Sequence, residues 1–316
     1  MKDLDSFPRI SLGLFPTPIH RLDGISRLLG TEVWIKRDDL SGLGLGGNKV
    51  RKLEFLLAEA RVQGAELVFT TGGAQSNHAM LTAAAAGKLG MEAVLILKER
   101  GVTACRGNQL LERLMGTEVR FVDTDDYADI YAEMDRLGQE RGRPYYKIPC
   151  GGSNALGSLG YVACARELLD QGAHFEHIVC AEGSGGTMAG LALGAKLFLP
   201  GTRVHGMMVD TDPFELITPA LMREAAALLE ADLTITAADF SLRDMCGPGY
   251  ARPSEEGNAA VALMAAREGI FLDPVYTGKA FAGLLAMARE GAFAPGERVL
   301  FLHSGGAGGL FAVDMN

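Results

Sequence analysis

Long apolar runs and an excess of basic residues are both missing from this 316-residue sequence. No stretch reaches the ~18 uninterrupted apolar residues that a membrane helix needs. The segment Met1–Asp5 has no basic region followed by an apolar one, so we expect neither a membrane span nor a signal peptide. The 30 basic and 39 acidic side chains give a formal charge of −9. Nucleic acids and anionic membranes are bound through basic surfaces, so we expect neither as a partner.

Cysteine pairing is also unsupported by the sequence. The number of cysteines is odd and no CxxC spacing occurs, which argues against a disulfide framework and against a zinc site. We therefore expect a cytoplasmic protein with reduced, mostly buried thiols and no metal. The five residues are Cys105, Cys150, Cys164, Cys180 and Cys246.

Short β-rich segments alternate with helical patterns along nearly the whole sequence. Helical spacing is clear at Val50, Leu53, Leu57 and Ala60. Strands separated by helices favour right-handed crossovers and a mostly parallel sheet, so we predict an α/β fold. The predicted strands are Glu66–Thr71, Ala93–Lys98, Glu118–Val122, His177–Glu182, Val204–Asp210 and Val299–His303.

Two domains are expected from the length. No linker-like composition marks a boundary between them. We place a small domain at residues 46–154, which ends just after Gly151-Gly152. It is inserted in a large domain formed by residues 1–45 and 155–316.

Glycine, by contrast, is abundant: 41 of 316 residues is about 13%, nearly twice the usual ~7%. The glycines gather in segments 42–49, 71–78, 182–187 and 303–309, at predicted strand ends or helix starts. In an open α/β sheet, ligands bind outside the carboxyl ends of the strands. We therefore expect these four loops to form the ligand site.

The third loop, Gly183-Ser184-Gly185-Gly186-Thr187, joins a predicted strand to a predicted helix. Unpaired amides and the helix dipole hold phosphate at such a place, and Ser184 and Thr187 add hydroxyl groups. A nucleotide-hydrolysing P-loop does not fit, because Lys196 is too far along the chain. A GxGxxG motif does not fit either, because Met188 takes the sixth position. An ordinary glycine-rich turn is the alternative interpretation.

The first loop presents Lys49 at a predicted helix start, which is unfavourable for a cation in the helix dipole. Such an amine is shifted toward the neutral, nucleophilic form that Schiff-base chemistry needs. Lys52 lies on nearly the same helical face and could reach an anion bound beside Lys49. The alternative is that Lys49, Arg51 and Lys52 form a solvated basic face.

The second loop carries Gln75, Ser76 and Asn77 at another predicted helix start. These groups and the local amides are suited to binding a substrate carboxylate, and Ser76 is available for proton transfer. N-capping by Ser76 or Asn77 is the simpler interpretation and is compatible with binding.

The stretch GGNKVRKLE at residues 46–54 resembles the lysine motif of the D-cysteine desulfhydrase and 1-aminocyclopropane-1-carboxylate (ACC) deaminase family, whose members use pyridoxal phosphate. The resemblance covers essentially the whole chain in order. It implies the fold of the tryptophan synthase β-subunit type (fold type II): two α/β domains with parallel-type twisted sheets flanked by helices, a cofactor in the cleft and a homodimer. The other matching segments are IKRDD at 35–39, QSNH at 75–78, GGSNALG at 151–157, GPGY at 247–250 and LDPVYTGK at 272–279.

The resemblance also implies a role for each loop. Lys49 would bind pyridoxal phosphate covalently, and Asn77 would hydrogen-bond its phenolic oxygen. Gln75, Ser76 and Asn77 would bind the substrate carboxylate. Tyr250 and Tyr276 would project into the site and act on substrate protons, although a single tyrosine is more often a core or interface residue. The other cofactor-binding residues would be Lys52, Gly183, Ser184, Gly185, Gly186, Thr187 and Ser304.

Two positions favour one activity within the family. In ACC deaminases, the segment that matches residues 275–279 resembles Val-Tyr-Glu-Gly-Lys, with the glutamate near the pyridine nitrogen. These enzymes also have leucine after the histidine of the last glycine-rich loop. Thr277 and Ser304 stand at these positions here. A hydroxyl gives a weaker electron sink than a carboxylate, sufficient for expelling a β-thiolate. We therefore predict a carbon–sulfur lyase that converts D-cysteine, or a related β-substituted amino acid, to pyruvate, ammonia and hydrogen sulfide.

The substrate is less well defined than the cofactor, because Gly306-Ala307-Gly308-Gly309 departs from the desulfhydrase pattern. L-Cysteate sulfo-lyase, ACC deaminase and amino-acid racemase are alternatives on the same scaffold. No extra cation for a sulfonate is evident, and Asp210 would oppose a sulfonate if it lined the pocket. A non-catalytic binder of pyridoxal phosphate or of another phosphorylated ligand is the remote alternative.

Overall fold

The computed structural model describes residues 1–315 and contains two sheets. The larger sheet has the strand order β1-β2-β10-β7-β8-β9. All neighbours are parallel except β1, which runs antiparallel to β2. Because β10 pairs with β2, both ends of the chain contribute to this sheet. Its strands are β1 (Ile19–Arg21), β2 (Glu32–Arg37), β7 (His177–Glu182), β8 (Arg203–Met208), β9 (Ser241–Asp244) and β10 (Arg298–His303).

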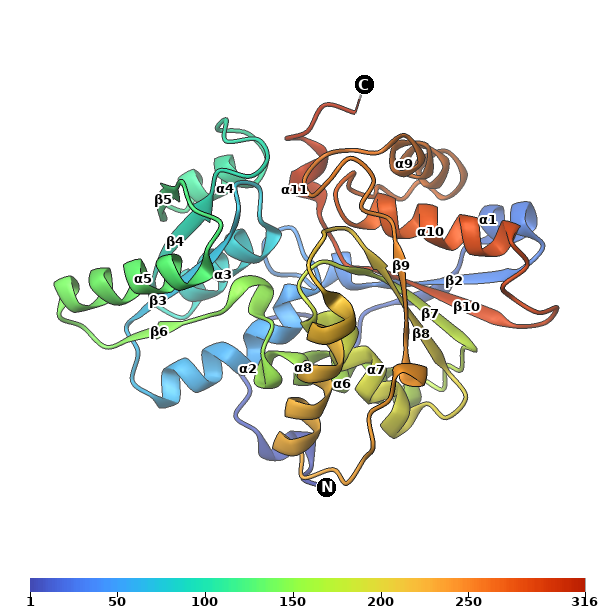
Figure 1. Ribbon diagram of the computed structural model, residues 1–316, viewed down its shortest axis with the longest axis horizontal. Helices are drawn as coiled ribbons and strands as arrows, with labels where there is room; N and C mark the ends of the chain where they lie inside the picture. The colour runs from blue at the N-terminus through green and yellow to red at the C-terminus, as the bar shows by residue number, and fades with distance from the viewer. Residues whose placement is uncertain (316) are drawn as a thin grey trace.

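The smaller sheet is entirely parallel and has the order β5-β4-β3-β6. Figure 1 shows it on the left of the molecule and the larger sheet on the right. All its strands lie within residues 46–154, and so do the covering helices α3 (Asn77–Lys88), α4 (Asn108–Leu114) and α5 (Tyr127–Arg141). We therefore propose residues 46–154 as the small domain. The strands are β3 (Leu67–Gly73), β4 (Glu92–Lys98), β5 (Glu118–Val122) and β6 (Tyr145–Lys147).

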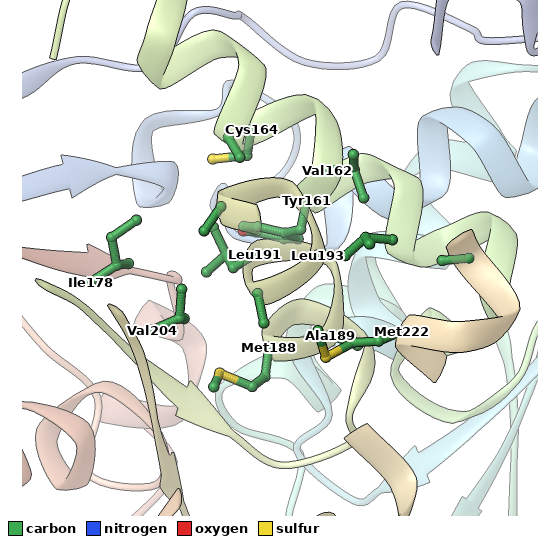
Figure 2. Close-up of a cluster of buried hydrophobic side chains, with 14 of the residues drawn as sticks. Tyr161, Val162, Cys164, Ile178, Met188, Ala189, Leu191, Leu193, Val204 and Met222 are labelled. Carbon is green, nitrogen blue, oxygen red and sulfur yellow. The ribbon is translucent and has the colours of Figure 1, made fainter. Parts of the chain in front are cut away.

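Helices cover both faces of each sheet, which explains why the inner strands are apolar on both sides. In the larger sheet, α6, α7 and α8 pack on one face, and α1, α9 and α10 pack on the other. Figure 2 shows Tyr161 and Cys164 of α6 and Met188 and Leu191 of α7 meeting above the sheet. In the smaller sheet, α2 and α3 cover one face and α5 the other.

The helices are α1 (Asp23–Leu29), α2 (Lys49–Val62), α3 (Asn77–Lys88), α4 (Asn108–Leu114), α5 (Tyr127–Arg141), α6 (Ala155–Asp170), α7 (Gly186–Phe198), α8 (Phe214–Leu228), α9 (Glu255–Glu268), α10 (Thr277–Arg289) and α11 (Ala307–Leu310). Short 3₁₀ turns lie at Leu4–Ser6, Asp38–Leu40, Cys150–Gly152 and Ala237–Asp239. Within residues 1–315, no helix combines the length and apolar character needed to cross a membrane.

The predicted α/β fold is confirmed, and each of the six predicted strands is present to within two residues at either end. Strands β1, β2, β6 and β9 were not predicted from the sequence. Three of these have four residues or fewer, which is too short for a periodic pattern.

Candidate active site

A cavity of about 300 Å³ lies where the carboxyl ends of strands from both sheets meet. Gly72 and Gly73 come from the end of β3, Glu182 from the end of β7, and Ser304 follows β10. This is the position at which open parallel sheets bind ligands. The cavity therefore draws its walls from segments far apart in the sequence.

The structure brings most of the predicted site residues to this cavity. Three do not line it: Lys52, Gln75 and Gly186. Those that do are Lys49, Ser76, Asn77, Gly183, Ser184, Gly185, Thr187, Tyr250, Tyr276 and Ser304.

Lys49 is the first residue of α2, directly after the first glycine-rich loop. Gly46 is required in that loop: its φ is +71°, and a Cβ there would lie 1.8 Å from the carbonyl oxygen of Asp39. The Asn48 amide donates to the Ser304 carbonyl at 3.0 Å, which ties the helix start to the loop after β10. Burial of the Lys49 amine lowers its pKa, against the raising effect of Cys150 and Glu182. A larger fraction of this amine is therefore neutral than in water.

The alternative interpretation of a solvated basic face on α2 is wrong. Arg51 is 1% exposed and Lys52 is fully buried. The Lys52 amine donates to the Gly151 carbonyl at 3.0 Å and to the Ser153 hydroxyl at 3.1 Å. It therefore lies behind the cavity wall, although a Cβ on Gly186 would come within 2.8 Å of it.

The third glycine-rich loop leads from β7 into the 13-residue helix α7. Gly185 is its N-cap with φ +88°, and the Gly186 amide donates to Ser153 Oγ at 3.2 Å. Ser153 Oγ also donates to Ser184 Oγ at 3.0 Å. The amides and hydroxyls of this loop, with the buried Lys52 behind them, have the chemistry that binds a phosphate group.

The second glycine-rich loop ends at Ser76, which is the N-cap of α3 and accepts a hydrogen bond from the Ala79 amide at 3.2 Å. Asn108 donates from Nδ2 to Asn77 Oδ1 at 2.8 Å. This bond orients the Asn77 amide and leaves its Nδ2 to donate to a ligand. Gln75 has a different role, because its side chain bonds to the carbonyls of Val102 and Arg106.

Tyr250 and Tyr276 meet at the cavity, with their hydroxyl oxygens 2.5 Å apart. A Cβ on Gly73 would lie 3.0 Å from the Tyr250 ring, and one on Gly183 would lie 3.4 Å from the Tyr276 ring. The pair therefore spans from the second loop to the third. Burial raises the pKa of both tyrosines, so both hydroxyls keep their protons at neutral pH.

Thr277 does not line the cavity. Its hydroxyl donates to Asp273 Oδ1 at 2.7 Å and accepts from the Asp273 amide at 2.8 Å. Of the two hydroxyl residues that favoured desulfhydration, only Ser304 faces the cavity.

The expectation that no further cation serves the site is also wrong. Lys98 and Arg100, at and just beyond the carboxyl end of β4, both line the cavity, and so does Asp210. Arg100 pairs with Asp125 at 2.7 Å and more distantly with Asp210 at 3.8 Å. The signal for them was available in the sequence, because the residues after a parallel strand point toward the ligand edge. Glu182 and Asn108 were missed as well.

Comparison with known proteins gives consistent matches over nearly the whole chain. A model of the family described as "Pyridoxal-phosphate dependent enzyme" matches residues 10–305. Two relatives share the name "Putative 1-aminocyclopropane-1-carboxylate deaminase". That of Pyrococcus furiosus is 41% identical over 98% of this chain and 94% of its own length. That of Pyrococcus horikoshii is 43% identical over the same shares.

Solved structures agree with these matches. The crystal structure of an ACC deaminase homologue is 42% identical and superimposes with a TM-score of 0.91, covering 98% of this chain and 94% of that one. The crystal structure of a threonine deaminase shares the fold at 21% identity, with a TM-score of 0.64 and 92% of each chain covered.

Proposed function

This chain belongs to the family of pyridoxal-phosphate-dependent enzymes, and we propose that it is a lyase that removes the β-substituent of D-cysteine. The balanced reaction consumes D-cysteine and water and releases pyruvate, ammonia and hydrogen sulfide. The observation that carries the proposal is that Lys49 and the Tyr250–Tyr276 pair line the same cavity. A β-elimination needs a proton acceptor at Cα and a proton donor at the departing sulfur.

The residues of the cavity fit the cofactor. The loop from Gly183 to Thr187 would hold the phosphate, with Lys52 behind it, and Asn77 would donate to the phenolic oxygen. The Gly186 position supports this fit, because Lys52 Nζ and Ser153 Oγ would each lie only 2.8 Å from a Cβ there. When bound, pyridoxal phosphate withdraws electrons from the α-carbon of the attached amino acid.

Lys49 would hold the cofactor and then accept the Cα proton at Nζ. Its lowered pKa supports this role, because a base must be unprotonated to act. Ser76 and the amides at the start of α3 would bind the substrate carboxylate. One hydroxyl of the tyrosine pair would donate a proton to the sulfur as the Cβ–S bond breaks.

ACC deamination is the second candidate, because two relatives above 40% identity carry the name "Putative 1-aminocyclopropane-1-carboxylate deaminase". The balanced reaction consumes ACC and water and releases 2-oxobutanoate and ammonia. Elimination of sulfite from L-cysteate is a third, favoured by Lys98 and Arg100 at the cavity but opposed by Asp210, which also lines it. We further propose a cytoplasmic homodimer; five free cysteines support a reducing compartment, and the mass in solution tests the dimer.

One assay separates these functions. Holoenzyme is incubated with D-cysteine, L-cysteine, ACC and L-cysteate, and pyruvate, 2-oxobutanoate, sulfide and sulfite are measured. We expect pyruvate and sulfide in equal amounts from D-cysteine. Fully loaded enzyme that releases neither product from D-cysteine would overturn the proposal, and 2-oxobutanoate from ACC would support the second candidate. Optical rotation of the remaining amino acid reports racemisation.

A further inference from the structure

Glu182 ends β7 and stands immediately before the third glycine-rich loop. It is 1% exposed and lines the cavity. Oε1 accepts a hydrogen bond from the Gly185 amide at 2.6 Å. Oε2 is buried and has no hydrogen-bond partner among residues 1–315. A buried carboxyl oxygen without a partner is costly, which points to a group that the cavity is built to receive.

The position of Glu182 conflicts with an anionic ligand. Its carboxyl group accepts the hydrogen bond of the Gly185 amide, at the N-cap of α7. This is where the loop would bind phosphate. A carboxylate and a phosphate dianion in one buried site repel each other strongly. A proton on the carboxyl group removes that repulsion and converts the partnerless oxygen into a donor.

The positive charge around Glu182 comes from two buried lysines. Lys49 and Lys52 face it from α2, and burial lowers the pKa of both amines. Cys180 faces it from β7, and a Cβ on Gly206 of β8 would lie 3.3 Å from the Cβ of Glu182. Burial raises the pKa of Glu182 to about 7, against the lowering effects of the Gly185 amide, the two lysines and the Ser184 amide. An added phosphate group would raise this pKa further.

We propose that Glu182 is a cofactor-positioning residue that is protonated in the holoenzyme and donates a hydrogen bond from Oε2 to the phosphate group. This inference rests on the proposed role of the Gly183–Thr187 loop in phosphate binding, and it does not depend on the substrate. Binding then takes up a proton whenever the free carboxyl group is ionised. Affinity for the cofactor falls above about pH 7, by up to about 10-fold for each pH unit.

The variant Glu182→Gln tests this proposal. Glutamine keeps an acceptor for the Gly185 amide and places an N–H₂ donor at the other position, which mimics the protonated acid. The dissociation constant of pyridoxal phosphate is measured from about pH 7 to about pH 9 for both proteins. The amines of Lys49 and Lys52, whose pKa values are lowered, titrate in both proteins, so Glu182 is reported by the difference between the two pH profiles. We expect the affinity of the natural protein to fall roughly 10- to 100-fold more than that of Glu182→Gln over this interval.

The matched control is Glu112→Gln. Glu112 is also a buried carboxyl, has no hydrogen-bond partner within residues 1–315 and has a raised pKa of about 8, but it does not line the cavity. This variant must keep the pH dependence of the natural protein. Parallel pH profiles for the natural protein and Glu182→Gln would overturn the proposal.

A second measurement needs no variant. Calorimetry in two buffers of different ionisation enthalpy gives the protons taken up when the full chain, freed of cofactor, binds pyridoxal phosphate or pyridoxal. We expect up to one additional proton for the phosphorylated ligand near about pH 8. Equal proton counts would overturn the proposal. Neither measurement uses turnover, so either result stands even if D-cysteine is not the substrate.

Discussion

Helix α2 buries cations in two contrasting environments. Arg51 is matched: its guanidinium donates to Asp38 at 2.8 Å and to Glu167 at 2.8 Å. The Tyr161 hydroxyl also donates to Asp38 at 2.6 Å. Burial acts to raise the pKa of Asp38, but Arg51 and Tyr161 outweigh it and hold the pKa below its usual value. Every charge in this cluster has a partner.

Lys49 and Lys52 are unmatched by comparison. Lys52 bonds only to the neutral oxygens of Gly151 and Ser153 among residues 1–315, and burial lowers its pKa well below the usual value. Paired charge holds α2 against α6, whereas we propose that the unpaired amines of Lys49 and Lys52 react with the cofactor or bind its phosphate. Breaking a pair should cost stability, and removing an unpaired cation should cost function.

The largest expected effect is on function. Lys49→Ala should lose covalent cofactor capture and roughly 10²- to 10⁴-fold or more in rate, because the proton acceptor at Cα is gone. The visible absorption of bound cofactor and pyruvate release measure it. Arg61→Ala, an exposed cation on the same helix, is the control and should behave as the natural protein. Retained absorption and rate in Lys49→Ala would contradict the assignment.

Arg51→Met should destabilise the fold by about 3–5 kcal/mol, because Asp38 and Glu167 would be left buried without their partner. The free energy of unfolding from urea denaturation measures this. Arg61→Met, whose side chain is exposed, should change it by less than about 0.5 kcal/mol. A change of less than about 0.5 kcal/mol for Arg51→Met would show that the buried ion pair contributes nothing to stability.

Lys52→Met should produce the opposite pattern. We expect cofactor affinity to fall about 10- to 100-fold, the value of a charged hydrogen bond to phosphate. The free energy of unfolding without cofactor should stay level or rise, because an unpaired buried cation is removed. Equilibrium binding and urea denaturation measure the two quantities. A loss of stability equal to that of Arg51→Met would remove the distinction between the two environments.

The smallest expected effect concerns Glu112, an unmatched charge outside the cavity. Burial raises its pKa from 4.5 to about 8, so the folded state holds the proton more tightly than the unfolded state. Stability should therefore fall as pH rises from the unfolded pKa to about 8, and then level off. Glu112→Gln should flatten this slope and gain about 1–2 kcal/mol near neutral pH. Urea denaturation across that pH range measures it, and an unchanged slope would contradict it.

Prediction from sequence succeeded where the signal is local. The strand His177–Glu182 was predicted with its observed bounds, because a continuous apolar run marks a strand buried on both faces. Glu118–Val122 was also predicted with its observed bounds, although none of its residues is fully buried. Prediction failed for β2, whose sequence EVWIKR ends in charged residues. Lys36 is fully buried there only because Glu167, 131 residues away, pairs with it. No local sequence pattern indicates a partner so distant in the sequence.

The residues of the candidate site also fall into those that local sequence predicted and those that it did not. Loop chemistry indicated Lys49, Ser76 and the Gly183–Thr187 loop, because glycine, hydroxyl groups and helix starts are visible in any short segment. Thr277 was misplaced, since its hydroxyl turns to Asp273. The sequence did not indicate a role for Glu182, because a carboxylate beside a glycine-rich loop can be interpreted only once its burial is known.

By itself, the sequence determined the order of the six predicted strands, the four glycine-rich loops and the lysine at the start of α2. These follow from backbone conformation and hydrophobic periodicity, which act over a few residues. Only the tertiary structure decided that Arg51 is paired while Lys49 and Lys52 are not, and that one oxygen of Glu182 has no partner within residues 1–315. The protonation state of a buried group depends on neighbours brought from distant parts of the chain, because burial and nearby charge set its pKa.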